Sequence, residues 1–236
     1  MKRIEGVVIG LVDEVDAKLG RVRVTFPWMD PPQKSHWAPI ASLLSGKKRG
    51  ARFMPEKHDE ALVAFDRGQF DHPYVVGFLW NGEDEAPDNV QQNRVVVTPG
   101  GHELRFEDKD GDRRIVVKTA FGHSLTLDDK SNTVTLATKN GGKVTLDDTP
   151  GRAEVEASQH KVTLGPGGMT VESLGPMTIR SSGVMNIQSA GMVNLTASVL
   201  SVSAPVATFS GVLQANTVVA TSVVSSVYSP GLGNLV

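Results

Sequence analysis

The feature that most constrains this chain is a run of eight-residue units near its C-terminal end. Glycine recurs at every eighth position, at Gly167, Gly175, Gly183 and Gly191. Apolar residues stand two and four positions after each glycine, with one polar residue between them; they are Met169, Val171, Met177, Ile179, Met185, Ile187, Val193 and Leu195. Alternation with a period of two is typical of a strand with one buried face. The glycines are expected to form the corners between strands, where a positive φ or a close backbone approach excludes a side chain.

Less regular copies of this unit extend in both directions. Triplets such as Val-Thr-Leu recur from Ile115–Val117 to Val162–Leu164, and about fourteen units are expected between Arg105 and Val227. A short strand with two inward side chains cannot bury itself, so it needs copies stacked above and below it. A monomeric solenoid and a triangular prism of three chains both meet this need, and turns such as Asp110-Gly111 also permit hairpins. Because the units are short and their core residues slim, we expect the trimeric prism, a β-helical needle.

Charge is distributed unevenly along the chain. Only three charged residues, Lys161, Glu172 and Arg180, lie after residue 160, and all tryptophans and histidines lie before residue 161. A shift of this size marks a change of architecture. We therefore expect two domains, residues 1–95 and residues 96–236, the second being the β-helical needle. A tail with few charges also suits passage through a membrane, because each charge carried into the bilayer is costly.

The first domain reads as short strands separated by turns. Arg21–Phe26 alternates between polar and apolar residues, and Ala61–Phe65 and Pro73–Leu79 are further strand candidates. Prolines punctuate these segments. Five or six strands in about ninety residues suit a small Greek-key barrel such as an OB-fold. The fold class is therefore all-β, with an OB-fold barrel followed by an octad-repeat β-helix.

Composition excludes several classes of protein. The chain has no cysteine, which excludes disulfide frameworks, thiol catalysis and cysteine-bound zinc. Its net charge of -2 is too weak to hold nucleic acid by bulk charge alone. Val7–Val12 is too short for a secretory signal, and no run of about 20 apolar residues is present. We expect a protein assembled in the cytoplasm without a signal peptide.

Candidate chemical sites are weak. The acidic run Asp108–Asp112 has its glycine in the wrong place for an EF-hand calcium loop. The basic run Lys47–Arg49 is expected to be solvated or to contact protein rather than to grip phosphate. The paired carboxylates at 128–129 and 147–148 lie at expected turns, where neighbouring side chains point apart. The sequence therefore predicts no catalytic residue, no metal site and no cofactor.

At the level of motifs, the chain resembles a known family. The motifs that carry this resemblance occur in the order Gly20–Trp28, Ser35–Trp37, Gly50–Glu56, Asp59-Glu60, Ala64-Phe65, Pro73–Gly77, Asn93-Arg94 and Gly100–Phe106. Followed by octads, they resemble the central spike of contractile injection systems, which includes phage baseplate assembly protein V and the VgrG spike of type VI secretion. The resemblance implies an OB-fold collar on a trimeric β-helix, seated on a separate baseplate hub protein. With no hub domain before the barrel, the chain looks like the stand-alone form found in phage tails or extracellular tail-like particles.

The resemblance also implies a tip. Some spikes of this family end in paired histidines that bind iron, but the last histidine here is His160. A blunt prism end leaves unpaired strand edges that must be covered. We therefore expect a separate tip protein of the PAAR type to dock on Val223, Val227, Tyr228, Leu232, Leu235 and Val236.

The leading function hypothesis is a structural, non-enzymatic spike that pierces a target envelope and contacts its membrane transiently. One alternative is a β-helical glycan depolymerase or tailspike enzyme. The tail argues against it, because its aromatic and acidic residues are only Phe209, Tyr228 and Glu172. The other alternative is an OB-fold nucleic-acid binder, which salt-dependent binding of single-stranded DNA would favour.

Overall fold

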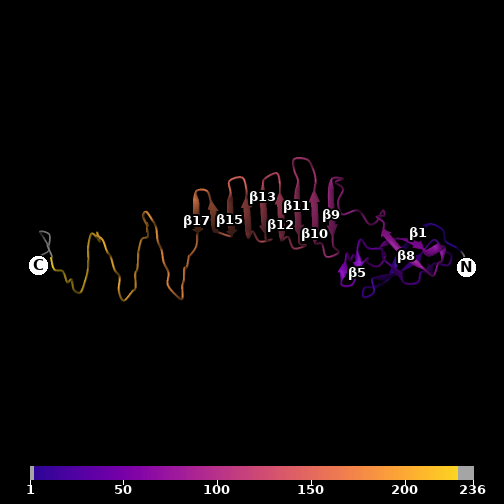
Figure 1. Cartoon of the computed structure of the whole chain (residues 1–236), viewed down its shortest axis with the longest axis horizontal. Coiled ribbons are helices and arrows are strands. Elements are labelled where there is room, and N and C mark those ends of the chain that lie inside the picture. Colours follow the sequence, from indigo (N-terminus) through magenta and orange to yellow (C-terminus); the bar gives the residue numbers. More distant parts are fainter. Residues whose placement is uncertain (1–2, 228–236) are drawn as a thin grey trace. The chain divides into compact units, whose positions relative to one another are not determined.

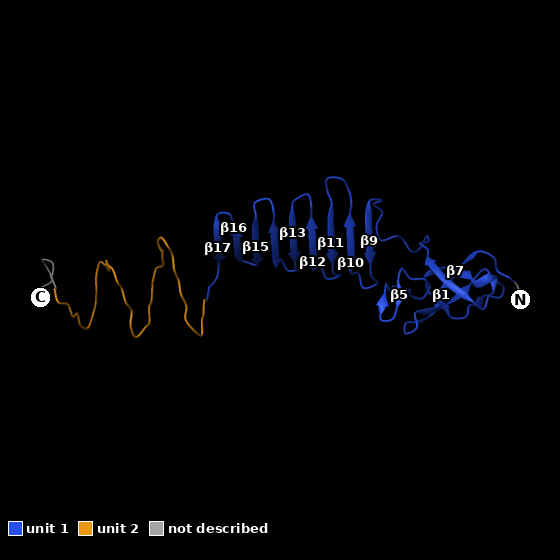
Figure 2. Cartoon of the chain, in the orientation of Figure 1, with its two compact units in different colours: residues 1–178 blue, residues 179–236 orange. Residues whose placement is uncertain are grey.

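The computed structural model describes residues 3–227, and nearly all of their regular structure is β (Figure 1). The only helical segment described is a 3₁₀ turn, η1 (Asp66–Gly68). None of the described residues belongs to a helix long and apolar enough to cross a bilayer. The chain separates into two compact units, residues 1–178 and 179–236 (Figure 2). The expectation of an all-β fold is confirmed.

The N-terminal strands form a small barrel. They are β1 (Val7–Asp16), β2 (Arg21–Phe26), β3 (Gln33–Lys34), β4 (Ala38–Pro39), β5 (Ser45–Gly46), β6 (Arg49–Gly50), β7 (Glu60–Phe65) and β8 (Pro73–Phe78). Six of them form one sheet in the order β3-β2-β1-β7-β8, with β4 also paired to β2, while β5 and β6 form a separate hairpin. A parallel bridge between Ile40 and Val75 links the chain after β4 to β8 and closes the barrel.

Alternation within these strands builds the barrel core. The buried residues are Val12, Val22, Val24, Phe26, Ala38, Ala61, Val63, Phe65 and Val75. Phe26 packs against Phe65 and Phe70, with ring centroids 5.8 Å apart in each pair. Gly10 lies in β1 beside the paired strand β2, and a Cβ added there would stand 2.9 Å from the Thr25 carbonyl oxygen. Only glycine allows the two strands to approach this closely.

The repeats after the barrel form a second sheet of nine strands. They are β9 (Asn93–Val97), β10 (Glu103–Glu107), β11 (Arg114–Lys118), β12 (Ser124–Asp128), β13 (Thr133–Ala137), β14 (Lys143–Asp147), β15 (Arg152–Ala157), β16 (His160–Gly165) and β17 (Gly168–Ser173). Figure 1 shows them side by side in sequence order. Each strand is antiparallel to the next, so these units are joined as hairpins, an arrangement that their turn residues permit.

Three of these hairpins share one turn design. Thr98, Thr119 and Thr138 directly follow β9, β11 and β13, and each threonine hydroxyl accepts the backbone N–H four residues later, at 3.1, 3.1 and 3.0 Å respectively. The glycine three residues after each threonine has a positive φ. Side-chain caps of this kind supply hydrogen bonds that a tight turn otherwise lacks. The turns therefore repeat along one edge of the sheet, although their sequences differ.

The second unit, described to residue 227, has a different local structure. It contains no strand among its described residues, and its chain zigzags between bends (Figure 2). All its described residues are exposed. Because no strand pairs with this backbone among the described residues, most of its N–H and C=O groups need other hydrogen-bond partners once they are buried.

Candidate assembly interface

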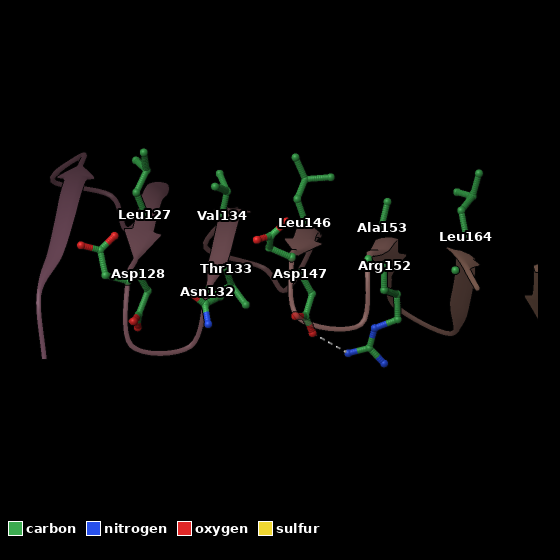
Figure 3. Close-up of a pocket in the computed structure, with 14 residues that line it drawn as sticks. Leu127, Asp128, Asn132, Thr133, Val134, Leu146, Asp147, Arg152, Ala153 and Leu164 are labelled. Atoms are coloured by element: carbon green, nitrogen blue, oxygen red, sulfur yellow. Dashed lines mark hydrogen bonds and ion pairs between the residues drawn. The ribbon is translucent and has the colours of Figure 1, made fainter. Parts of the chain in front are cut away.

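One face of the nine-stranded sheet is apolar. The strand register aligns its side chains in two rows across the sheet. The first row is Val96, Leu104, Val117, Leu125, Leu136, Val144, Val155, Val162 and Val171; the second, beginning at β10, is Phe106, Ile115, Leu127, Val134, Leu146, Ala153, Leu164 and Met169. We call these the two apolar rows. Figure 3 shows part of the second row, with Leu127, Val134, Leu146 and Leu164 pointing to the same side of the sheet.

The apolar rows are exposed in the single chain. In the second row, the exposed fraction of the large side chains ranges from 37% at Ile115 to 66% at Met169. On the opposite face, by contrast, the side chains of Glu103 and Arg105 are only 20% and 22% exposed. An apolar face of this extent marks an interaction surface, because a stable soluble protein rarely leaves one bare. Among residues 3–227, therefore, no layer covers the apolar side of the sheet.

The opposite face is polar and internally paired. Glu107 and Arg114 are direct cross-strand neighbours, joined by an ion pair of 2.7 Å. Glu154 pairs with Lys161 at 3.0 Å, and this partner holds the pKa of the Glu154 carboxyl below its ordinary value. Cross-strand pairs of opposite charge stabilise a sheet modestly and suit a surface in contact with water. The two faces thus differ in solvation as well as in composition.

A hollow of about 700 Å³ lies on this sheet, and acidic residues lie beside its leucines (Figure 3). Asp128 accepts the backbone N–H groups of Ser131 and Lys130 at 3.0 and 2.9 Å, and the Ser131 bond lowers the pKa of its carboxyl. Asp147 pairs with Arg152 at 3.2 Å. Both carboxylates therefore hold turns and neighbouring strands together. A carboxyl group with a lowered pKa is poorly suited to act as a general acid near neutral pH.

The structure divides the octad residues between two environments. Met169 and Val171 lie in β17, opposite Leu164 and Val162 of β16, and end the two apolar rows. The remaining six lie outside regular strands and are exposed: Met177, Ile179, Met185, Ile187, Val193 and Leu195. Their assignment to a trimer core stays a prediction.

The expected corner glycines have two settings. Gly167 lies in the turn between β16 and β17, whereas Gly175, Gly183 and Gly191 lie at bends. None of these four is among the glycines with a positive φ. A Cβ on Gly183 would meet nothing within 4 Å in the described chain. A positive φ is therefore not the reason for glycine at these positions, and their assignment as corners stays a prediction.

The expected tip-docking residues are only partly described. Val223 and Val227 are exposed, at 66% and 86%. Tyr228, Leu232, Leu235 and Val236 lie outside the described residues. Within residues 3–227, no group of three or more metal-ligating side chains is close enough to hold an ion.

The trimer-core residues expected from the sequence include only two members of the apolar rows, Met169 and Val171. Residues such as Leu104, Leu125 and Leu136 alternate with polar residues just as the octads do. That alternation is the signal that would have found them. The strand register adds what the alternation cannot supply, namely that all of these side chains share one face.

Comparison with known proteins is consistent with this architecture. Residues 5–80 match the family described as the type VI secretion system/phage-baseplate injector OB domain. The chain is 37% identical over 111 residues to the type VI secretion system spike protein VgrG5 of Pseudomonas aeruginosa, a match that covers 42% of this chain and 14% of that protein. It is 27% identical over 110 residues to the spike protein VgrG3 of Vibrio cholerae, covering 42% of this chain and 11% of that protein.

The matches thus span a small part of these relatives, 14% and 11% of their lengths. Within this chain, the family match covers the closed barrel described above. The OB-fold expectation for the first domain is confirmed. Residues 5–80 are thus similar to the injector OB domain, and about two fifths of the chain is similar to VgrG spike proteins.

Proposed function

We propose that this protein is the non-enzymatic central spike of a contractile injection machine and acts as a homotrimer. The observation that carries the proposal is the pair of exposed apolar rows, which extend across the nine-stranded sheet. Burying such a face is the main source of free energy available for assembly. Copies of this chain supply the matching apolar face, because each brings the same two rows.

Three copies fit the octads better than two. Bends recur at Gly175, Gly183 and Gly191, and between successive bends the alternation places only two large apolar side chains on one side, two and four positions after the glycine. Such a segment pairs with no strand among the described residues. Three segments arranged as a triangle bury all their inward side chains on one axis, and stacking along the axis pairs the backbone groups. Two sheets packed face to face would cover the rows but would not explain the repeated bends.

The mechanical role follows from this arrangement. A needle with a fully paired backbone and a surface of serine, threonine and asparagine carries few charges into a membrane. Only Glu172 and Arg180 are charged after Lys161. In this proposal the spike sits on a separate baseplate hub in a phage tail or tail-like particle, pierces the target envelope during contraction and carries a PAAR-type tip protein.

The trimer is tested by measuring the mass of the full chain by light scattering after size exclusion. We expect three times 25.2 kDa. Leu136→Glu places a charge in the first apolar row and should abolish the trimer, because three like charges would be buried without partners. Thr135→Glu places the same charge on the other face of the same strand and should leave it intact. A stable monomer at micromolar concentration would refute the proposal.

The tip is tested separately. Deleting residues 229–236, which lie outside the described residues, should leave the trimer intact and abolish binding of a purified PAAR-type protein. Replacing the same segment with a glycine-serine stretch of equal length separates loss of side chains from loss of chain length. If the deleted chain still binds the tip protein, the docking assignment is wrong.

A further inference from the structure

A groove of about 750 Å³ lies on the barrel, between the segment 40–54 and the end of β8. Its apolar lining includes Leu43, Leu44, Phe53 and Phe78. We call this the barrel groove. Leu43 is 94% exposed and Phe53 is 66% exposed. Large apolar side chains gathered at this exposure in a concave surface indicate a binding site for another molecule.

The groove wall is a built structure. The Ala51 N–H donates to the Leu44 carbonyl at 2.9 Å, and the Ser42 hydroxyl donates to the Ala51 carbonyl. Arg52 donates to the Ala17 carbonyl at 3.0 Å, which ties the segment to the end of β1. These bonds hold the apolar side chains on an ordered frame. A preformed frame lowers the entropic cost of binding a partner.

Charge at the groove is of one sign. The segment 41–54 contains Lys47, Lys48, Arg49 and Arg52 and no acidic residue. Lys48, Arg49 and Arg52 line the groove, and no acidic residue lines it. Within residues 3–227 these four cations form no ion pair, although Arg23, Lys34 and Lys57 of the same barrel do. The groove therefore presents apolar surface with unpaired positive charge at its rim.

From this combination we infer that the barrel groove docks a peptide segment of a partner protein that carries leucine or phenylalanine anchors flanked by aspartate or glutamate. Apolar anchors fill the groove, and carboxylates meet the cations at the rim. Nucleic acid fits less well: Phe53 and Phe78 offer stacking surface, but the net charge of the chain is -2, and a strand of phosphates needs a stronger positive field than three cations supply. A two-fold contact with a second copy would set the same cations against each other, which costs free energy. The inference does not depend on the trimer.

The test uses the full chain and three fluorescein-labelled peptides. One combines leucine and phenylalanine with glutamate, the second replaces each glutamate with lysine, and the third replaces each apolar residue with serine. We expect only the first to bind in fluorescence anisotropy, and its affinity should fall as salt rises. Arg49→Glu and Phe53→Ser should each weaken binding about tenfold or more. Both side chains are exposed, so the barrel should fold without them.

Lys139→Glu is the matched control, since it makes the same charge reversal at an exposed hairpin of the other sheet. Its affinity for the first peptide should equal that of the unchanged protein. The proposal is overturned if the lysine peptide binds equally well, if no peptide binds, or if Arg49→Glu has no effect. If an oligothymidylate binds the groove more tightly than the first peptide does, the proposal is overturned in favour of nucleic acid. Oxidative self-linking of Leu43→Cys would overturn it in favour of a second copy.

Discussion

Arg105 of β10 and Asp88 of the segment before β9 form an ion pair. The Asp88 carboxylate also accepts the Asn93 side-chain amide at 2.8 Å and the Val90 N–H at 2.7 Å. Asp88 thus joins the irregular segment after β8 to the first hairpin of the nine-stranded sheet. Glu103 on the same strand is the second partner of Arg105 and the main cause of its raised pKa. The start of the sheet is therefore held by a charged cluster rather than by apolar packing.

Removing the charge of Asp88 should loosen this attachment. The Asn93 amide, the Val90 N–H and the Arg105 charge hold the pKa of Asp88 below its ordinary value. A lowered pKa in the folded state stabilises the protein above the unfolded pKa of about 4, and this stabilisation is lost as pH falls through the folded pKa. We expect Asp88→Asn to speed limited proteolysis between residues 79 and 92 at neutral pH, and to flatten the dependence of proteolysis on pH below 4. Asp110→Asn, at a solvated turn, should change neither; equal rates for Asp88→Asn and the unchanged protein would count against this role.

Adding one methyl group at Gly10 should destabilise the barrel. The new Cβ would stand 2.9 Å from both the Thr25 carbonyl oxygen and the Phe26 ring, so β1 and β2 must separate. We expect Gly10→Ala to cost about 1–3 kcal/mol, the usual range for overpacking a core. Thermal or urea denaturation followed by tryptophan fluorescence measures this loss. At Gly82 a Cβ would meet nothing within 4 Å, so Gly82→Ala should be neutral; an equal effect of both changes would mean that the close approach is unimportant.

A charge at an inward octad position should prevent assembly. In the proposed trimer three copies of Ile187 meet near the axis, so Ile187→Asp buries like charges without partners. We expect loss of the trimer, or of soluble protein, in native mass spectrometry. Asn186→Asp adds the same charge to the adjacent polar position and should leave the trimer intact. Unchanged thermal stability of Ile187→Asp would show that the inward face is assigned wrongly.

The absence of natural cysteine makes a direct proximity test possible. Leu136→Cys lies in the first apolar row, so neighbouring copies should bring its thiols within disulfide distance. We expect a cross-linked dimer on a non-reducing gel after mild oxidation, with one thiol of each trimer left free. Thr135→Cys, on the polar face of β13, should stay uncross-linked at the same protein concentration. Cross-linking of both variants alike would indicate random collision rather than an ordered interface.

Much of this fold is determined locally and was predicted from the sequence. The alternation of Leu125, Thr126 and Leu127 specifies a strand and the two sides of that strand, because successive side chains of an extended chain point in opposite directions. Asn140-Gly141 likewise favours a tight turn, since glycine adopts the positive φ that the turn requires. The barrel core at Val22, Val24 and Phe26 follows from the same alternation.

Other features depend on which segments meet, and no local pattern specifies that. The sequence by itself left hairpins and a winding octad path both open for the units before Gly167, and only the register of β9 to β17 decided for hairpins. Arg105 forms an ion pair with Asp88, which lies seventeen residues earlier in the chain. Phe53 and Phe78 line one groove although β7 lies between them in the sequence. Neither pair has a periodic signal, because both arise from the closure of a loop. Local alternation thus determined the faces of each strand, whereas long-range pairing decided which side chains share a surface.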